Sequence, residues 1–268
     1  MTINDQSYYV AGGRTGVLLM HSLCGTPAEM RFVANGMARA GYTVYCPELA
    51  AHGGSQADIE QTTWQDRYAS AEQALARLRK ECDAVIVGGL STGAVLALLL
   101  AARHPEDVHG TALVAPTFGL DGRLIPWFAR LLRTISNERI RDVIRMFSGD
   151  GSAAGLEDSL LVNALRAEIG TIRQPALILH PRQDDHADLD HAWYLQRNLK
   201  GLVDMVVLDD SRHIVTADRQ RNLVVERATA FVGSTAKSVQ ATSAKAGVAT
   251  RSRALAEIAC TLLATLAT

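Results

Sequence analysis

The stretch VIVGGLSTGAVLALLL, residues 85–100, decides the fold of this chain. It opens with β-branched residues typical of a buried parallel strand, and it closes with an Ala- and Leu-rich run that favours helix. Between them lies GLSTG, residues 89–93, which at a strand-to-helix turn forms a nucleophile elbow of the G-x-S-x-G type. Glycines are needed where the backbones of strand and helix approach too closely for a side chain. The stretch therefore predicts a strained backbone at Ser91 that exposes the serine hydroxyl.

Two other interpretations of this stretch are weaker. With 21 glycines in 268 residues, a chance G-x-S-x-G is not rare, but the strand before it and the helix after it argue against chance. The run from residue 84 to 102 carries no charge and is long enough to cross a bilayer. Its central cluster of Gly, Ser and Thr favours a turn instead. We therefore expect a buried strand and a buried helix, and no stable membrane span.

The composition indicates a globular protein with a large core. Hydrophobic residues make up 48% of the chain, and the formal net charge is −1, so nothing suggests nucleic acid as a partner. Residues 1–6 lack the basic and apolar regions of a signal peptide. The cysteines Cys24, Cys46, Cys82 and Cys260 have no metal-binding or redox spacing. We expect a cytoplasmic protein with reduced thiols.

Strand-like and helix-like segments alternate along most of the chain, which predicts a three-layer α/β fold with a mostly parallel central sheet. Ligands bind such sheets beyond the carboxyl ends of the strands. Ser91, the loop at 21–26, the acidic stretch at 184–190 and His213 all follow predicted strands, so we expect them at one edge. Besides the central element, strands are predicted at 7–11, 17–20, 42–46, 110–115, 176–179 and 203–208, and helices at 27–40, 64–80, 188–199 and 214–231.

Residues 116–174 contain apolar helical stripes and no predicted strand, so we interpret them as a helical lid insertion. The first stripe is expected to face the catalytic edge and line an apolar substrate pocket. Its residues are Leu124, Ile125, Phe128, Leu131 and Leu132. The predicted division is a discontinuous core of residues 1–115 and 175–233, the insertion 116–174, and a tail 234–268.

The tail begins with small polar residues, which predict a flexible linker to about Thr250. Apolar residues then recur at helical spacing and predict a short amphipathic helix. Its apolar face requires a surface to pack against. This surface is the body of the same subunit, a sister subunit or another partner. Basic residues are too few to favour a membrane. The residues of this face are Leu255, Ile258, Leu262, Leu263 and Leu266.

A serine nucleophile needs a base, and the base needs an orienting carboxylate. His213 follows the last predicted strand and is our candidate base; the alternative is a surface or helix-capping histidine. Four aspartates compete for the carboxylate. Asp184 is favoured because a loop leaving the strand can still turn back there, and Asp185 is second. Asp188 and Asp190 are assigned to the next helix.

The same stretch also permits a metal-site hypothesis, because six potential ligands crowd together and two of them would share a helical face. Acidic residues at a strand end are common without a metal, however. We therefore expect no metal and no cofactor. The six residues are His180, Asp184, Asp185, His186, Asp190 and His191.

Several short motifs resemble the bacterial monoacylglycerol lipase and carboxylesterase branch of the α/β-hydrolases, over roughly residues 15–115 and 175–232. The motifs are HSLCGTP at 21–27, GYTV at 41–44, HG at 52–53, TTW at 62–64, GLSTG at 89–93 and SRH at 211–213. The resemblance implies a three-layer α/β-hydrolase with a lid over an acyl pocket. It also implies Ser91 as nucleophile, Asp184 as acid and His213 as base, with backbone N–H groups of Leu23 and Thr92 as oxyanion donors.

The chain departs from the family pattern at three places. Ser22 stands where the oxyanion loop usually has Gly, Ala94 stands where a second Gly often follows the elbow, and residues 185–188 are polar where the family is usually apolar. We predict a serine hydrolase acting on a small-molecule carboxylic ester through an acyl-enzyme. The alternatives are a thioesterase or other acyl-transfer relative, or a non-catalytic ligand-binding module on the same fold.

Overall fold

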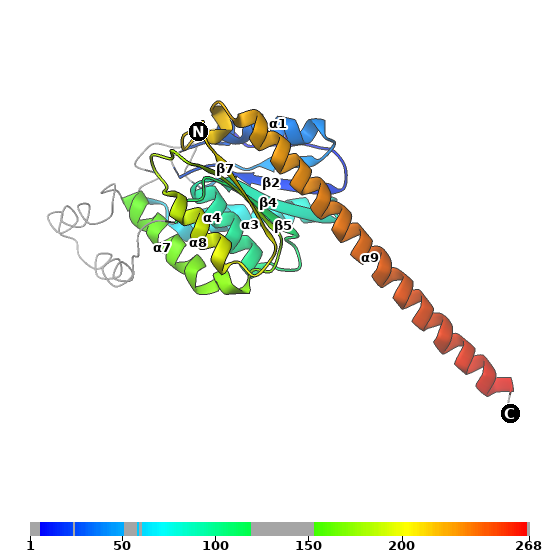
Figure 1. Ribbon diagram of the computed structural model, residues 1–268. Helices are drawn as coiled ribbons and strands as arrows, with labels where there is room; N and C mark the ends of the chain where they lie inside the picture. Colours follow the sequence, from blue (N-terminus) through cyan, green and yellow to red (C-terminus); the bar gives the residue numbers. More distant parts are fainter. Residues whose placement is uncertain (1–5, 24, 51–57, 59–60, 119–152, 267–268) are drawn as a thin grey trace, which may run out of the picture.

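The computed structural model describes residues 6–23, 25–50, 58, 61–118 and 153–266. These residues form a seven-stranded sheet with helices on both faces (Figure 1). The strand order is β1-β3-β2-β4-β5-β6-β7. The three-layer α/β fold predicted from the sequence is confirmed. The strands are β1 Tyr8–Val10, β2 Thr15–Met20, β3 Thr43–Cys46, β4 Ala84–Leu90, β5 Gly110–Val114, β6 Ala176–Pro181 and β7 Val203–Leu208.

The pairing register brings the carboxyl ends of the central strands to one edge. β1 pairs antiparallel with β3, and all other pairs are parallel. Met20 of β2 lies opposite Gly89 of β4, and Leu90 lies opposite Val114 of β5. Val114 in turn lies opposite Leu179 of β6. The loops that leave these strands therefore start side by side, as expected for a ligand-binding edge of a parallel sheet.

Two hydrophobic clusters fill the space between the sheet and its helices. Side chains alternate along each strand, so Leu18 and Val87 contribute to one cluster while Leu19 and Ile86 contribute to the other. Helices α3, α4, α7 and α8 cover the first face, and α1 with the start of α9 covers the second (Figure 1). The α-helices are α1 Arg31–Arg39, α3 Trp64–Glu81, α4 Thr92–Arg103, α7 Ala153–Glu168, α8 Leu189–Asn198 and α9 Arg221–Leu266; short 3-10 turns are Pro27–Met30, Ile169–Thr171 and Val215–Ala217.

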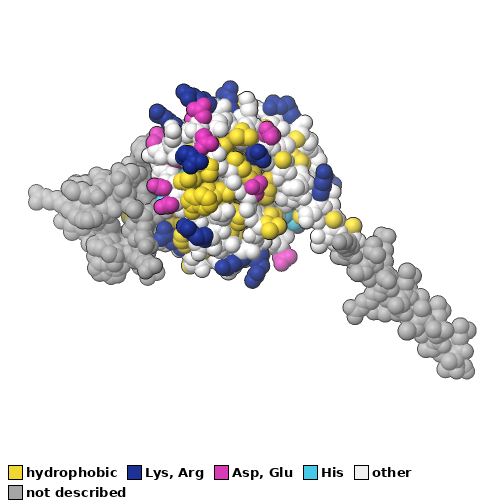
Figure 2. Space-filling model, viewed as in Figure 1, with side chains coloured by type: hydrophobic (Ala, Val, Ile, Leu, Met, Phe, Trp, Pro, Cys, Tyr) yellow, Lys and Arg dark blue, Asp and Glu magenta, His cyan; other side chains and the backbone are white. Residues whose placement is uncertain are grey.

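The uncharged stretch at 84–102 is a buried strand followed by a buried helix. Every residue of α4 from Thr92 to Ala101 is buried, because β4 lies on one side of the helix and α7 on the other. This surrounding protein explains why α4 is apolar all round. Among the described residues, no helix has the length and apolarity needed to cross a bilayer. Figure 2 shows acidic and basic side chains interspersed over this face of the body, which fits the net charge of −1.

The described part of the predicted insertion differs from expectation. Helix α7 places Leu161, Val162 and Leu165 in the same buried cluster as α4, and Ile169 and Ile172 extend that contact. These residues therefore pack as part of the main body rather than of a separate lid. The stripe Leu124, Ile125, Phe128, Leu131 and Leu132 lies outside the described residues.

The predicted linker after residue 233 is wrong. Helix α9 runs without a break from Arg221 to Leu266, 46 residues, and leaves the body in Figure 1. Val224, Ala228 and Val232 anchor its first part, and burial continues beyond the predicted boundary at Ala236. Between residues 234 and 250, the segment predicted as a linker contains five alanines and no proline. Its helix propensity therefore decides its structure, although the segment has few apolar side chains to bury.

Candidate active site

Ser91 lies at the strained turn between β4 and α4. Its backbone has φ 57° and ψ −119°, a left-handed conformation that costs a non-glycine residue about 1–3 kcal/mol. A Cβ on Gly93 would lie 2.3 Å from the carbonyl oxygen of Met20, and one on Gly89 would lie 2.5 Å from the same oxygen. Both distances exclude a side chain. The strained serine and the crowded glycines predicted from the sequence are therefore confirmed.

Asp184 and His213 form a hydrogen-bonded pair in the loops after β6 and β7. Nδ1–H of His213 donates to both carboxylate oxygens at 2.9 Å. Oδ1 of Asp184 also accepts the backbone N–H groups of His186 and Ala187, at 2.8 and 2.9 Å. The side chains are almost closed to solvent, with 1% of Asp184 and 8% of His213 exposed.

The electrostatics of this pair favour an ionised carboxylate. Burial alone raises the pKa of Asp184, but the hydrogen bond from His213, two backbone N–H donors and attraction to His213 together lower that pKa below its ordinary value. A carboxylate fixed on Nδ1 leaves Nε2 of His213 as the basic nitrogen. Asp188 and Asp190 belong to α8, as predicted: Asp188 is its N-cap and accepts the backbone N–H of Asp190 at 3.0 Å.

The hydroxyl of Ser91 makes a contact that the sequence analysis missed. Oγ of Ser91 lies 2.8 Å from Oγ1 of Thr117, which follows the end of β5. Among the described residues, Ser91 makes this hydrogen bond and none to His213. The signal that was available is the position of Thr117, directly after a predicted strand that ends at the same edge as the serine.

The loop after β2 is fixed by a carboxylate. Glu29 accepts the backbone N–H of Ser22 at 3.0 Å and its hydroxyl at 2.8 Å, both at Oε2. His21 is fully buried; Nδ1–H donates to the carbonyl of Ser22 at 2.9 Å, and Nε2 accepts the backbone N–H of Leu49 at 3.2 Å. Ser22, which departs from the family pattern, therefore has a polar partner. Leu23 is partly buried in this loop, and its oxyanion role stays a prediction.

Two adjacent acidic residues of α7 accept hydrogen bonds from the first residues of α4 and α3. The hydroxyl of Thr92, the residue after Ser91, donates to Asp158 at 2.9 Å. Glu157 is buried and accepts the backbone N–H of Trp64, the first residue of α3, at 3.0 Å. Carboxylates at helix N-termini are electrostatically favourable. These bonds attach α7 to the helix that carries the nucleophile.

An open cavity of about 380 Å³ lies beside the imidazole of His213. The residues of the predicted apolar pocket lie outside the described ones. The lining of the cavity is mixed: Asp185, His186, Arg212, His213, Ile214, Ala217 and Asp218.

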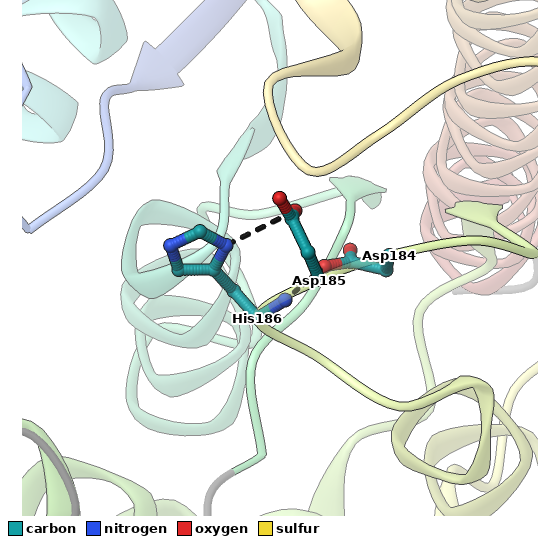
Figure 3. Close-up of side chains that lie close together, drawn as sticks. All are labelled: Asp184, Asp185 and His186. Atoms are coloured by element: carbon teal, nitrogen blue, oxygen red, sulfur yellow. Dashed lines mark hydrogen bonds and ion pairs between the residues drawn. The ribbon is translucent and has the colours of Figure 1, made fainter.

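Figure 3 shows the acidic cluster that permitted a metal-site hypothesis. Potential ligand atoms of Asp184, Asp185 and His186 lie within 4.8 Å of one another. Each already has a partner in the chain, however. Asp184 binds His213, and Oδ1 of Asp185 lies 3.1 Å from Nδ1 of His186. The His186 ring also stacks on His213, with centroids 4.9 Å apart. A metal would have to compete with these contacts.

The two other histidines of this stretch have structural contacts. Nε2–H of His180 donates to the carbonyl of Ala187 at 3.0 Å, and Nδ1 of His191 accepts the backbone N–H of Phe118 at 3.1 Å. Burial is the main cause that lowers the pKa of both imidazoles, which favours their neutral form. Absence of a metal stays a prediction.

Comparison with known proteins shows the family of this chain. Residues 13–146, half of the chain, match the family model Hydrolase_4, described as serine aminopeptidase, S33. A thermostable monoacylglycerol lipase from Bacillus sp. (strain H-257) is 30% identical over 84% of this chain and 93% of that protein. The chain belongs to this family.

The hydrolase also resembles more distant relatives. A carboxylesterase from Bacillus subtilis (strain 168) is 21% identical over 83% of the hydrolase and 94% of its own length. A solved structure from a study of the metagenome-derived lipolytic enzymes LipS and LipT superposes with a TM-score of 0.73 at 24% identity, over 85% of the hydrolase and 97% of that chain. The likeness to this solved structure shows that the chain has the same fold. The hydrolase is thus an α/β-hydrolase of the lipase and esterase type.

Proposed function

We propose that this hydrolase cleaves carboxylic esters through an acyl-enzyme formed on Ser91, with His213 as base and Asp184 as its orienting acid. The observation that carries the proposal is the buried pair in which Asp184 fixes Nδ1–H of His213. The strained elbow supports it, because the turn after β4 places Ser91, which is 7% exposed, at the same sheet edge as the loops that carry the pair.

In the proposed reaction, Nε2 of His213 takes the proton of Ser91 as Oγ attacks the ester carbonyl. The carbonyl electron pair moves to oxygen, and the resulting oxyanion is held by the backbone N–H groups of Leu23 and Thr92. The C–O bond to the leaving alcohol then breaks, and the imidazolium of His213 supplies the proton to that alcohol. Water, activated by the same imidazole, hydrolyses the acyl-enzyme and releases the acid.

The substrate class that we propose is an ester with an apolar acyl chain, such as a monoacylglycerol. The relative that is named a monoacylglycerol lipase supports this class. So do the apolar residues of the stripe at 124–132, which we propose line the acyl pocket. The cavity beside His213 is lined by charged as well as apolar side chains, and we propose that it takes the alcohol side of the ester.

A fluorophosphonate probe tests the nucleophile. We expect one probe per chain on Ser91 by mass spectrometry, loss of labelling in Ser91→Ala, and slow labelling in His213→Ala at unchanged far-UV circular dichroism. Hydrolysis of p-nitrophenyl esters, monoacylglycerols and acyl-CoA thioesters of matched chain length then tests the substrate. Absence of labelling contradicts the acyl-enzyme, and a preference for acyl-CoA favours the thioesterase alternative.

A further inference from the structure

The described residues contain two non-glycine residues with positive φ, and they lie at neighbouring strand ends. Ser91 follows β4 with φ 57°, and Ala115 follows β5 with φ 43°. Each such conformation costs about 1–3 kcal/mol and persists where the surrounding structure enforces it. The strain at Ser91 belongs to the elbow. The strain at Ala115 has no part in the proposed reaction described above, so it requires its own explanation.

Backbone hydrogen bonds hold both strained residues in place. The N–H of Ser91 donates to the carbonyl of Val114 at 2.9 Å, and the N–H of Ala115 donates to the carbonyl of Leu179 at 2.8 Å. Pro116 follows and is buried, and its ring fixes φ of that residue. The chain after β5 thus has little freedom. Its left-handed turn at Ala115 leads to Thr117, whose hydroxyl lies 2.8 Å from Oγ of Ser91.

The direction of this hydrogen bond decides what it does. Each hydroxyl has one proton to donate. If Ser91 donated its proton to Thr117, the same proton would be withheld from His213. The arrangement that serves attack by Ser91 is the one in which Thr117 donates and Oγ of Ser91 accepts.

We propose that Thr117 is a further catalytic residue, which donates a hydrogen bond to Oγ of Ser91 and stabilises that oxygen as it loses its proton. This inference rests on the proposed function of Ser91. The proton of Ser91 moves to Nε2 of His213 while Oγ bonds to the carbonyl carbon; Thr117 keeps its own proton throughout. Hydrogen bonds to a charged oxygen are stronger than those to a neutral one, so the bond gains strength in the transition state.

The experiment compares Thr117→Val, which keeps the shape and removes the donor, with Thr117→Ser, which keeps the donor. Thr111→Val is the matched control, because Thr111 is a buried threonine of β5, the strand that precedes Thr117, and its hydroxyl has no partner among the described residues. The measurement is the second-order rate of inactivation by the fluorophosphonate probe, with kcat and KM for a p-nitrophenyl ester alongside. We expect a loss of about 10- to 100-fold in inactivation rate and kcat for Thr117→Val, near wild-type values for Thr117→Ser and the control, and unchanged KM.

Two outcomes overturn the role of Thr117. Equal inactivation rates of wild type and Thr117→Val would leave the hydroxyl without a catalytic effect. A faster rate in Thr117→Val would show that Thr117 holds the serine away from His213. If Thr117→Val fails to fold, Thr117→Ala with a thermal-melting control replaces it. Failure of the wild type to label at Ser91 would instead contradict the proposed function, so the two failures are distinguishable.

Discussion

The two halves of the candidate site are built by different means. Ser91 is held by backbone geometry: a left-handed φ, and two glycines whose hydrogens face the carbonyl of Met20. Asp184 and His213 are held by polar contacts between side chains and backbone N–H groups. The first half requires glycine, because a Cβ at Gly93 would collide with the carbonyl of Met20. The second depends on specific oxygen and nitrogen atoms.

Because the two halves are built differently, substitutions in them are expected to affect stability and activity differently. A change at a glycine of the elbow should destabilise the fold together with activity, since strand and helix must move apart. A change in the hydrogen-bonded pair should reduce activity while most of the packing persists. Comparing kcat with unfolding free energy for each variant therefore tests whether the two halves differ as the structure indicates.

The largest effect is expected from Asp184→Asn. The amide keeps an oxygen for the N–H groups of His186 and Ala187 but favours the wrong tautomer of His213, so kcat should fall by about 10³- to 10⁴-fold. Asp185→Asn is the comparison, because Asp185 is adjacent and exposed, and its side chain contacts the His186 ring and the His213 backbone rather than Nδ1–H of His213. Steady-state kinetics and thermal melting measure both. If Asp185→Asn is the crippling change, the assignment of the acid is wrong.

Gly93→Ala tests the backbone-built half. The new methyl would lie 2.3 Å from the carbonyl oxygen of Met20 and 2.6 Å from that of His21. We expect a loss of about 1–3 kcal/mol in unfolding free energy together with loss of activity. Gly170→Ala is the control, since a Cβ there meets nothing within 4 Å. Urea unfolding measures both. A stable but inactive Gly93→Ala would mean that the elbow adjusts without cost to the fold.

The backbone-built half was also the more predictable from sequence. GLSTG between an apolar strand and an apolar helix specifies the elbow, because glycine is the residue that permits such close approach. His213 and Asp184 were proposed from their order and strand-end positions, with Asp185 left as an alternative. In the structure it is Asp184 that bonds His213, and the sequence pattern alone does not reveal which of two adjacent carboxylates turns inward.

The polar partners of the site residues were not predicted, and among them Thr117 alone had a sequence signal, its place after a predicted strand that ends at the same edge. Glu29, Thr117 and Asp158 approach the site from a 3-10 turn, a strand end and a helix. Each contact depends on tertiary packing rather than on local pattern. The tail differs from expectation for a local reason: its alanines favour helix although the segment has little apolar surface to bury.

Glu29 shows that the nucleophile side also contains a polar element. Removing its carboxylate in Glu29→Ala leaves the N–H and hydroxyl of Ser22 without partners and frees the loop that holds Leu23. We expect about a tenfold loss in kcat with KM unchanged, equivalent to about 1.4 kcal/mol. Ser22→Gly, which restores the usual family residue, should lose less because the backbone contact remains. Equal activity of Glu29→Ala and wild type would exclude a positioning role for this carboxylate.

Buried histidines on the acid–base side predict a pH dependence of stability. Because burial lowers the pKa of His180 in the folded protein, the unfolded chain binds more protons, and stability falls as pH decreases below about 6.5. The lowered pKa of Asp184 acts in a separate window: its stabilisation is present above the unfolded value of about 3.9 and is lost as pH falls toward its folded pKa.

His180→Gln tests the first window. The amide can still donate to the carbonyl of Ala187, but it cannot take up a proton. We expect the dependence of unfolding free energy on pH between 6.5 and 5 to flatten by up to about 1.4 kcal/mol per pH unit, the limit for one proton. Urea unfolding at a series of pH values measures it. An unchanged slope would assign the dependence to the other histidines whose pKa burial lowers, His191 and His109.

The smallest effect on activity is expected from shortening α9. Residues 237–244 are mostly exposed, whereas Thr235 and Ala236 are 6% exposed and Thr235 packs near Gly110 of β5. Deleting residues 245–268 should therefore leave kcat/KM unchanged and the melting temperature nearly so. Deleting residues 234–268 removes the buried pair as well, and should lower the melting temperature by about 2–4 °C, equivalent to about 1 kcal/mol.

The two truncations also test what the outer part of α9 does. A helix of 46 residues is about 69 Å long, and a helix end without tertiary packing is marginal in water. The apolar residues at 255–266 are expected to require a surface, either the body of the same subunit or a partner, and we propose a second copy of the chain, which supplies the same face. Light scattering should give a mass above that of a monomer for the full chain and a monomer for the 245–268 deletion. Monomers in both cases would exclude self-association through α9, and loss of activity in the shorter deletion would show that the catalytic edge depends on the outer helix.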